Sequence, residues 1–262
     1  MPDAAASRGA RTDGYTGRVR RTQVRDALVL RRSPLPSGDV VATLLSPTGT
    51  WRAIARKGRL PGGNLARLSL FHDVTVQFWR RREDDLALIT QVQLNGALAG
   101  LARPEAYPYA HLLAELADVL TVEQPADERC YALVASGLRG LHAHADPEAV
   151  GLAYAWRLLA LAGLAPDTRA CAGCGGEPSH LWIAEGLARC PACSEGVAGE
   201  RHADPALFLG PEALAELDAL VRGPLASAVH RPPADRARHW RTLRRYVRWH
   251  VGPVRALEAL RC

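Results

Sequence analysis

The sequence has no long uninterrupted hydrophobic run. Its longest apolar stretch, residues 149–165, is interrupted by Arg157, which indicates a buried helix rather than a membrane span. The first 21 residues are basic, but no apolar segment follows them, and a secretory signal needs such a segment. We therefore expect a cytoplasmic protein whose cysteines remain reduced thiols.

Signatures of common catalytic sites are also missing. The chain contains no GxxxxGK(S/T) phosphate-binding loop, no HExxH zinc-protease motif and no GxSxG nucleophile elbow. The acidic pair Asp84 and Asp85 lies beside three arginines in an expected turn, and the nine histidines are scattered along the chain. The sequence predicts a binding protein rather than an enzyme.

Lysine is nearly absent, whereas 32 arginines give the chain a net charge of +6. The charges are clustered. Residues 1–85 hold 16 basic and 8 acidic side chains and residues 222–262 hold 10 and 2, whereas residues 86–221 hold 7 and 17. A basic head and tail around an acidic middle favour a polyanionic partner. Coding bias toward arginine and alanine is the alternative origin of the high arginine count.

Five short runs rich in β-branched and aromatic residues lie between Val24 and Leu94, and turn signals separate them. Within residues 74–79, valine and phenylalanine alternate with threonine, glutamine and tryptophan, which is typical of a half-buried strand. Five strands with a long connection between the third and the fourth predict a small closed barrel of the OB type. A five-stranded sandwich is the alternative.

From Pro104 onward the hydrophobic period becomes helical. Asp146 followed by Pro147 is a helix N-cap with proline at the first helical position, and Asp204-Pro205 repeats this signal at a short helix or turn. The longer predicted helices cover residues 109–120, 127–142, 146–164, 211–221 and 234–250. The last of these is basic and amphipathic, so it would bind DNA or lie on a membrane. We favour packing of its apolar face on the other helices.

These patterns predict an α+β protein of several domains. The predicted parts are a mobile arm (1–20), an OB-type DNA-binding barrel (21–95), a helical domain in two segments (96–167 and 204–262), and a four-cysteine zinc finger inserted between those segments (168–203).

Four of the six cysteines form two C-x2-C pairs. Cys171 and Cys174 are separated by 15 residues from Cys190 and Cys193, a spacing typical of four-thiolate zinc sites. A redox pair would begin a helix in a βαβ unit, and the common iron–sulfur spacings differ. We predict one Zn²⁺ ion, which is structural because four cysteines leave no open position. Residues 178–188 would form a hairpin. The other two cysteines are expected in the core and at the chain end.

Basic side chains are concentrated on the predicted barrel strands and on the last helix. Guanidinium groups beside exposed aromatic rings form surfaces that bind phosphates and stack bases. Phe78 is in phase with the core, whereas Trp51 flanks a turn and Trp79 is out of phase, so either tryptophan is a candidate for exposure. The predicted DNA-binding residues are Arg20, Arg21, Arg25, Arg32, Trp51, Arg52, Arg56, Lys57, Arg59, Arg67, Arg80, Arg81, Arg241, Arg244, Arg245 and Arg248.

Residues 27–58 resemble the N-terminal barrel of the RecO recombination mediator family. In that family a strand leads to Gly-Glu, then to a second strand, a glycine turn and a strand ending in Lys-Gly. Here Gly38-Asp39, Gly49 and Lys57-Gly58 occupy these positions. The resemblance continues through the helices, the four cysteines and the segment RTLRRYVRWHVG at 241–252, and it covers residues 24–260. The arm at 1–20 is additional, and the loop after Lys57 has less lysine and serine than is typical.

The resemblance implies a bacterial DNA-repair protein that binds single- and double-stranded DNA and anneals complementary strands. Its implied partners are RecR and single-stranded DNA-binding protein, with RecA loaded as the outcome, at the nucleoid of the cytoplasm. Three alternatives remain open from the residues. They are an RNA-binding OB and zinc-ribbon protein of translation or transcription, a metal-dependent nuclease, and a protein adaptor that uses its acidic middle segment.

Overall fold

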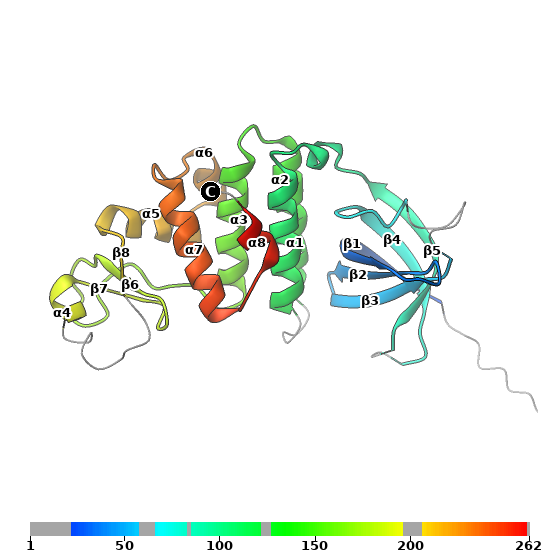
Figure 1. Ribbon diagram of the computed structural model, residues 1–262, viewed down its shortest axis with the longest axis horizontal. Coiled ribbons are helices and arrows are strands. Elements are labelled where there is room, and N and C mark those ends of the chain that lie inside the picture. The colour runs from blue at the N-terminus through cyan, green and yellow to red at the C-terminus, as the bar shows by residue number, and fades with distance from the viewer. Residues whose placement is uncertain (1–21, 58–65, 83–84, 122–126, 196–205, 261–262) are drawn as a thin grey trace, which may run out of the picture.

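The computed structural model describes residues 22–57, 66–82, 85–121, 127–195 and 206–260. Its elements form three regions in a row (Figure 1): a β-barrel at one end, helices in the middle, and a small sheet with the four-cysteine segment at the other end. The predicted arm at 1–20, the loop at 58–64 and the predicted turn at 204–205 lie outside the described residues.

The first region is a closed barrel with the strand order β1-β2-β3-β5-β4. Its strands are β1 (Gln23–Pro34), β2 (Val40–Ser46), β3 (Gly49–Ala55), β4 (Asp73–Trp79) and β5 (Ala87–Gly96). Antiparallel pairing of β1 with β4 closes the barrel, and β3 lies parallel to β5. The predicted strands and the OB-type barrel are confirmed. The sandwich alternative is wrong because the sheet closes on itself.

Inward-facing residues of each strand fill the barrel. In β4, Val74, Val76 and Phe78 are fully buried, as the alternation predicts. The expected exposure of Trp51 is wrong. Its side chain is 8% exposed, and its ring centroid lies 4.5 Å from that of Phe78 inside the barrel. Trp51 shares the inward phase of Ala53, and this phase outweighs its position beside a turn.

The second region is a helical body around α3 (Pro147–Leu161), which is buried along most of its length. On one side of it lie α1 (Tyr107–Thr121) and α2 (Glu128–Ala143), and on the other lie α5 (Pro211–Arg222), α6 (Leu225–His230) and α7 (Arg236–His250) (Figure 1). Asp127 and Asp146 cap α2 and α3 by accepting backbone hydrogen bonds. The longer predicted helices are confirmed. Among the described residues, no helix combines the length and apolar character that a membrane crossing requires.

Hydrophobic periodicity did not predict the short helices η1 (Ala99–Ala102), α4 (Pro191–Glu195), α6 and α8 (Arg255–Ala259). In α8, the carboxylate of Glu115 on α1 accepts hydrogen bonds from the first two backbone N–H groups. Arg244 of α7 donates to carbonyl groups at the other end of α8. Side chains distant in sequence thus satisfy both ends of a helix too short to be stable alone.

The barrel packs directly on α1. Leu28, Leu30 and Leu45 from its strands belong to the same hydrophobic cluster as the helical body. The guanidinium group of Arg31 also lies 3.6 Å from the carboxylate of Asp118 on α1. This continuous core fixes the orientation of the barrel relative to the helices.

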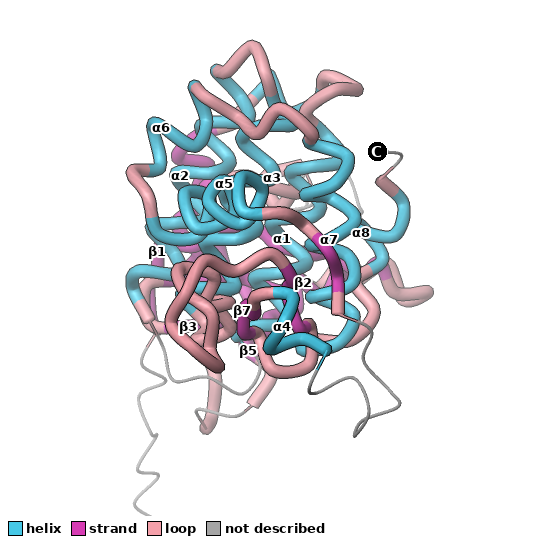
Figure 2. Tube along the Cα trace, turned by 90° about the vertical axis from the view of Figure 1, so that its left-hand side faces the viewer, coloured by secondary structure: helices cyan, strands magenta, loops and turns pink. Residues whose placement is uncertain are grey.

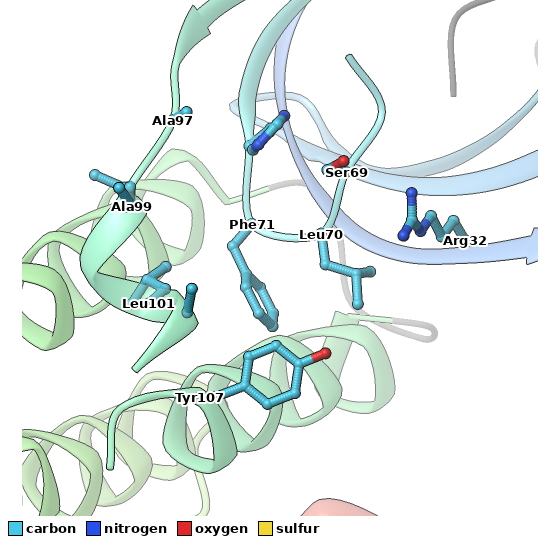
Figure 3. Close-up of a pocket in the computed structure, with 11 residues that line it drawn as sticks. Arg32, Ser69, Leu70, Phe71, Ala97, Ala99, Leu101 and Tyr107 are labelled. Atoms are coloured by element: carbon cyan, nitrogen blue, oxygen red, sulfur yellow. The ribbon is translucent and has the colours of Figure 1, made fainter. Parts of the chain in front are cut away.

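A cavity of about 260 Å³ opens at this junction (Figure 3). Phe71 points from the barrel side toward Tyr107 of α1, and the centroids of the two rings are 6.0 Å apart. Phe71 has a φ of +66°, a conformation that non-glycine residues rarely adopt. The predicted DNA-binding residue Arg32 lines this cavity, so it lies beside the helical body.

The third region contains the sheet β7-β6-β8, formed by β6 (His180–Trp182), β7 (Leu187–Arg189) and β8 (Leu207–Phe208). The predicted hairpin is confirmed, because Trp182 of β6 pairs with Leu187 of β7. Figure 2 looks along the molecule from this end and shows β7 and α4 below α5 and α7. We call residues 167–195 together with β8 the metal unit.

Candidate metal centre and candidate nucleic-acid interface

The four cysteines of the two C-x2-C pairs converge on one point. The sulfur atoms of Cys171, Cys174, Cys190 and Cys193 all lie within 4.8 Å of one another. Cys174 Sγ is 3.8 Å from Cys190 Sγ, whereas disulfide sulfurs are about 2.05 Å apart. Metal–sulfur bonds of about 2.3 Å in a tetrahedron place the sulfurs about 3.8 Å apart. The arrangement therefore fits four-thiolate ligation of one metal ion and is compatible with zinc.

Backbone geometry shapes this cluster. The amide nitrogen of Gly173 lies 3.4 Å from Cys171 Sγ, and the amide nitrogen of Cys193 lies 3.5 Å from Cys190 Sγ, so N–H groups point at one sulfur of each pair. A Cβ atom at Gly173 would lie 2.8 Å from Cys193 Sγ. Glycine at this position therefore lets the two turns approach closely enough to share one ligand.

The electrostatics of the cluster also favour a cation. A backbone hydrogen bond from Cys190, followed by those from Cys174 and Gly173, lowers the pKa of Cys171 to about 6. Hydrogen bonds with the neighbouring sulfurs, Cys190 first, raise the pKa of Cys193 to about 12. The sulfur of Cys171 is thus ready to be a thiolate, while that of Cys193 resists further negative charge. A divalent cation would relieve this repulsion and allow all four sulfurs to ionise.

The metal unit is docked on α7. Gly186 of its hairpin has a φ of +65°, and a Cβ atom there would lie 2.7 Å from the hydroxyl oxygen of Tyr246. His250 Nε2 lies 2.7 Å from the carbonyl oxygen of Ile183. These contacts couple the folding of the metal unit to that of the helical body.

A row of apolar side chains crosses the outside of the barrel. The strand register places Ile54 of β3 beside Leu88 of β5, and Leu88 beside Trp79 of β4. All three are half-buried and face outward, because the residue before each of them is buried inside the barrel. Exposed arginines flank the row on β3, directly after β3 and after β4. We define the barrel face by six residues: Arg52, Ile54, Arg56, Trp79, Arg81 and Leu88.

Two more predicted residues, Arg25 and Arg80, lie at one end of the barrel. The guanidinium carbon of each is 5.5 Å from the ring centroid of Phe78. Both share the inward phase of Phe78, and both remain half-buried. Cation–π contacts with one buried ring therefore gather two positive charges at this end of the barrel.

A hydrogen bond joins two of the positions that carry the resemblance to the mediator family, Asp39 and Lys57. The backbone N–H of Lys57, which has a φ of +51°, donates to the carboxylate of Asp39 over 2.7 Å. This bond is the main cause that lowers the pKa of Asp39, and the charges of Arg56 and Lys57 add to it. Asp39 thus ties the turn between β1 and β2 to the basic end of β3.

Helix α7 divides its arginines into two groups. Three of them bond to the helical body or its neighbours: Arg236 to Asp146 and Glu148, Arg238 to the carbonyl of Leu209, and Arg244 to the end of α8. The predicted DNA contact Arg244 therefore has a structural partner. Arg241, Arg245 and Arg248 are exposed and form no hydrogen bond or ion pair within the described part of the chain.

The other predicted DNA-binding residues are dispersed. Arg67 is exposed on the connection between β3 and β4. Arg20, Arg21 and Arg59 lie outside the described residues. The arginines of α7 do not join the barrel face, because α3 and α1 lie between α7 and the barrel (Figure 1).

Two tryptophans belong to these basic surfaces but are absent from the predicted set. Trp79, half-buried on the barrel face, supplies the aromatic group that was expected of Trp51. Trp249 is 51% exposed at the end of α7. It follows Arg245 by four residues, so a helical projection of 234–250 places it on the basic side. In both cases the position of the tryptophan within the repeating pattern of its strand or helix indicates the outer, basic side.

Comparisons with known proteins find related sequences in one family. The sequence model of the family described as "Recombination protein O C terminal" matches residues 101–258. The chain is 32% identical over 242 residues to the DNA repair protein RecO of Thermobifida fusca, covering 89% of this chain and 96% of that protein. It is 33% identical to the RecO of Streptomyces griseus, covering 90% and 96%. For the RecO of Bifidobacterium longum subsp. infantis the identity is 33%, over 76% of this chain and 82% of that protein.

Proposed function

The chain belongs to the RecO family of DNA repair proteins, and from this premise we propose that it is a non-enzymatic recombination mediator. In this proposal it binds single- and double-stranded DNA and anneals complementary strands. Together with RecR it loads RecA onto DNA coated with single-stranded DNA-binding protein. It works in the cytoplasm, at the nucleoid.

The observation that carries the DNA-binding proposal is the barrel face. Arg52, Arg56 and Arg81 are exposed on the same outer side of a closed barrel as Trp79, and Leu88 of β5 lies between Trp79 and β3. Guanidinium groups bind phosphates by releasing condensed counterions, and an indole ring stacks on bases of any sequence. Such a surface supports binding without sequence preference, which a protein acting at any damaged site requires.

Annealing follows from this charge distribution without bond chemistry. Two DNA backbones repel each other, and a cationic surface lowers that repulsion while complementary bases pair. The protein has only to raise the local concentration of the two strands and then release the duplex. A surface of exposed, solvated arginines suits this task, because each contact is individually weak and salt-sensitive.

We propose Zn²⁺ as the metal, with one ion per chain held by Cys171, Cys174, Cys190 and Cys193. When bound, a zinc ion with four protein thiolates braces the fold and has no open position for a water or a substrate. The proposed role of the metal is therefore to stabilise the docking of the metal unit on α7, while DNA is bound elsewhere.

The test compares the salt dependence of binding in the wild type and in a barrel variant with Arg52→Gln, Arg56→Gln and Arg81→Gln. If the three cations contact three phosphates of a single strand, the slope of log K against log salt should fall by about two. Fluorescence anisotropy of a labelled oligothymidylate measures this slope. A slope equal to that of the wild type would show that these cations do not contact DNA phosphates and would contradict DNA binding by the barrel.

A matched control removes the same charge elsewhere. Arg139 and Arg231 are exposed on the helical body, and Arg169 is exposed within the metal unit, where it pairs with Asp167. Replacement of these three by glutamine should leave the slope nearly unchanged. Equal losses in the two triple variants would mean that net charge, rather than the barrel face, drives binding.

The activity itself is tested by annealing complementary oligonucleotides coated with single-stranded DNA-binding protein. The wild type should accelerate pairing, and the barrel variant should not. RNA strands of the same sequence are added as competitors in a parallel experiment. If RNA displaces DNA, 2′-hydroxyl contacts are used, and the RNA-binding alternative is favoured over DNA repair.

A further inference from the structure

The outward side of α7 holds a second combination of cations and an aromatic ring. Arg241, Arg245 and Arg248 lie on one side of the helix and span about 10 Å along its axis. The indole of Trp249 is 51% exposed and lies one helical turn beyond Arg245. The helix itself contains no acidic residue, and its N-cap Asp235, which pairs with Arg238, also interacts electrostatically with Arg241. We call Arg241, Arg245, Arg248 and Trp249 the α7 face.

The body of the protein holds α7 rigidly and presents this face outward. Trp240 and Leu243 on the opposite side are completely buried. Arg236 fixes the start of the helix through bonds of 2.6 Å to Asp146 and 3.2 Å to Glu148. Half of the arginines in α7 thus bond to the rest of the fold, whereas Arg241, Arg245 and Arg248 form no hydrogen bond or ion pair among the described residues. About half of the surface of Trp249 is exposed beside them.

A membrane is a poor occupant for this surface. An amphipathic helix lies on a bilayer by inserting its apolar side between the lipids. The apolar side of α7 is already buried in the protein, and the α7 face offers only one large apolar side chain. Its charge is complementary to a polyanion, and its single exposed indole is complementary to an unpaired base.

We infer that the α7 face is a second contact for single-stranded DNA, in which the arginines bind phosphates and Trp249 stacks on a base. This inference rests on the proposed function and deepens it. Because α3 and α1 separate α7 from the barrel (Figure 1), one chain presents two cationic surfaces. A long strand can engage both of them, or each surface can hold one of two strands to be paired.

The first test is Trp249→Ala in the full-length protein, with binding to a long oligothymidylate as the readout. Loss of one base-stacking contact should weaken binding about tenfold and leave the salt slope unchanged. Trp249→Phe should retain most of the affinity because phenylalanine keeps a stacking ring. The control is Phe208→Ala, which removes a ring that is 66% exposed on β8 of the metal unit and should have no effect.

The second test replaces Arg241, Arg245 and Arg248 by glutamine. Loss of three phosphate contacts should lower the salt slope by about two on single strands. The control is the triple variant of Arg139, Arg169 and Arg231 described above, which has the same net charge. The two tests separate stacking, which changes affinity alone, from phosphate contact, which changes the slope.

The possible outcomes are distinguishable. Wild-type affinity and slope in both α7 variants, with a reduced slope in the barrel variant, would overturn this inference and leave the proposed function standing. Absence of salt-dependent DNA binding by the wild type would overturn both. Unchanged DNA binding with lost adsorption to anionic phosphatidylserine vesicles would identify a membrane contact and also overturn the inference.

Discussion

The barrel and the metal unit are stabilised in different ways. Fourteen buried side chains form a hydrophobic core inside the barrel, so its outer surface is left to carry charge. The strands β6 and β7 have three residues each, and Leu181 and Ala188 are part of the core of the helical body. A unit this small has no core of its own and depends on metal ligation and docking. DNA binding by the barrel depends on many surface side chains, whereas the metal unit depends on four sulfur atoms. Mutations should therefore affect the two regions differently.

The largest expected effect comes from Cys190→Ser. Structural zinc contributes on the order of 10 kcal/mol to the folding of small four-ligand units, so loss of one thiolate should abolish metal binding and unfold the metal unit. Binding of oligonucleotides by the barrel should persist. Metal content by atomic absorption and binding by anisotropy measure the two outcomes. The control is Cys130→Ala, a buried cysteine outside the cluster, which should keep one ion per chain. Metal retention by Cys190→Ser would contradict the four-thiolate site.

The second prediction contrasts two tryptophans of the barrel. Trp51→Ala removes a ring packed on Phe78 in the interior and should lower the free energy of unfolding by about 3–5 kcal/mol. Trp79→Ala, on the barrel face, should cost much less stability but weaken DNA binding about tenfold through lost stacking. Urea denaturation and anisotropy together give the comparison. If the two variants were equally destabilised, the barrel would not divide into a core and a binding surface as described.

Periodicity predicted the parts of the fold that obey a repeating pattern. The alternation in β4 placed Val74, Val76 and Phe78 in the core correctly, and the C-x2-C spacing identified all four cysteines of the cluster. Trp51 was misjudged because the turn beside it was given more weight than its phase within the strand. Neither the pocket at Phe71 nor α8 was predicted. Both depend on contacts between distant residues, such as Glu115 with the start of α8, and local patterns do not encode such contacts.

The third prediction tests how closely the two cysteine turns must approach. In Gly173→Ala the new Cβ would lie 2.8 Å from Cys193 Sγ, so the turns should separate, with a loss of about 1–3 kcal/mol of stability and weaker metal binding. The matched control is Gly176→Ala, whose Cβ would lie 3.4 Å from Cys174 Sγ, where a small shift suffices. Competition with a chromogenic zinc chelator measures both. Equal affinities in the two variants would show that the cluster tolerates expansion.

The smallest expected effect concerns pH and the helical body, on which both other regions depend. His239 is completely buried on α7, and its Nε2 lies 2.9 Å from Glu216 Oε2. Burial is the main influence and lowers the pKa of His239 below 6.5, although Glu216 acts in the opposite direction. As the pH falls through 6.5, the unfolded chain therefore gains a proton before the folded protein does, and the free energy of unfolding should decrease.

Urea denaturation of the wild type and of His239→Gln across this pH range isolates the contribution of one histidine among nine. The wild type should lose more stability than the variant on acidification, by up to about 1.4 kcal/mol for each unit by which the pKa is lowered. Glu216→Gln removes the opposing influence, so its loss should continue to lower pH than in the wild type. Parallel curves for the wild type and His239→Gln would mean that the ion pair with Glu216 balances burial, and a smaller loss in the wild type than in the variant would mean that the ion pair outweighs burial. Acid would then leave α7 in place, and with it the docking surface of the metal unit.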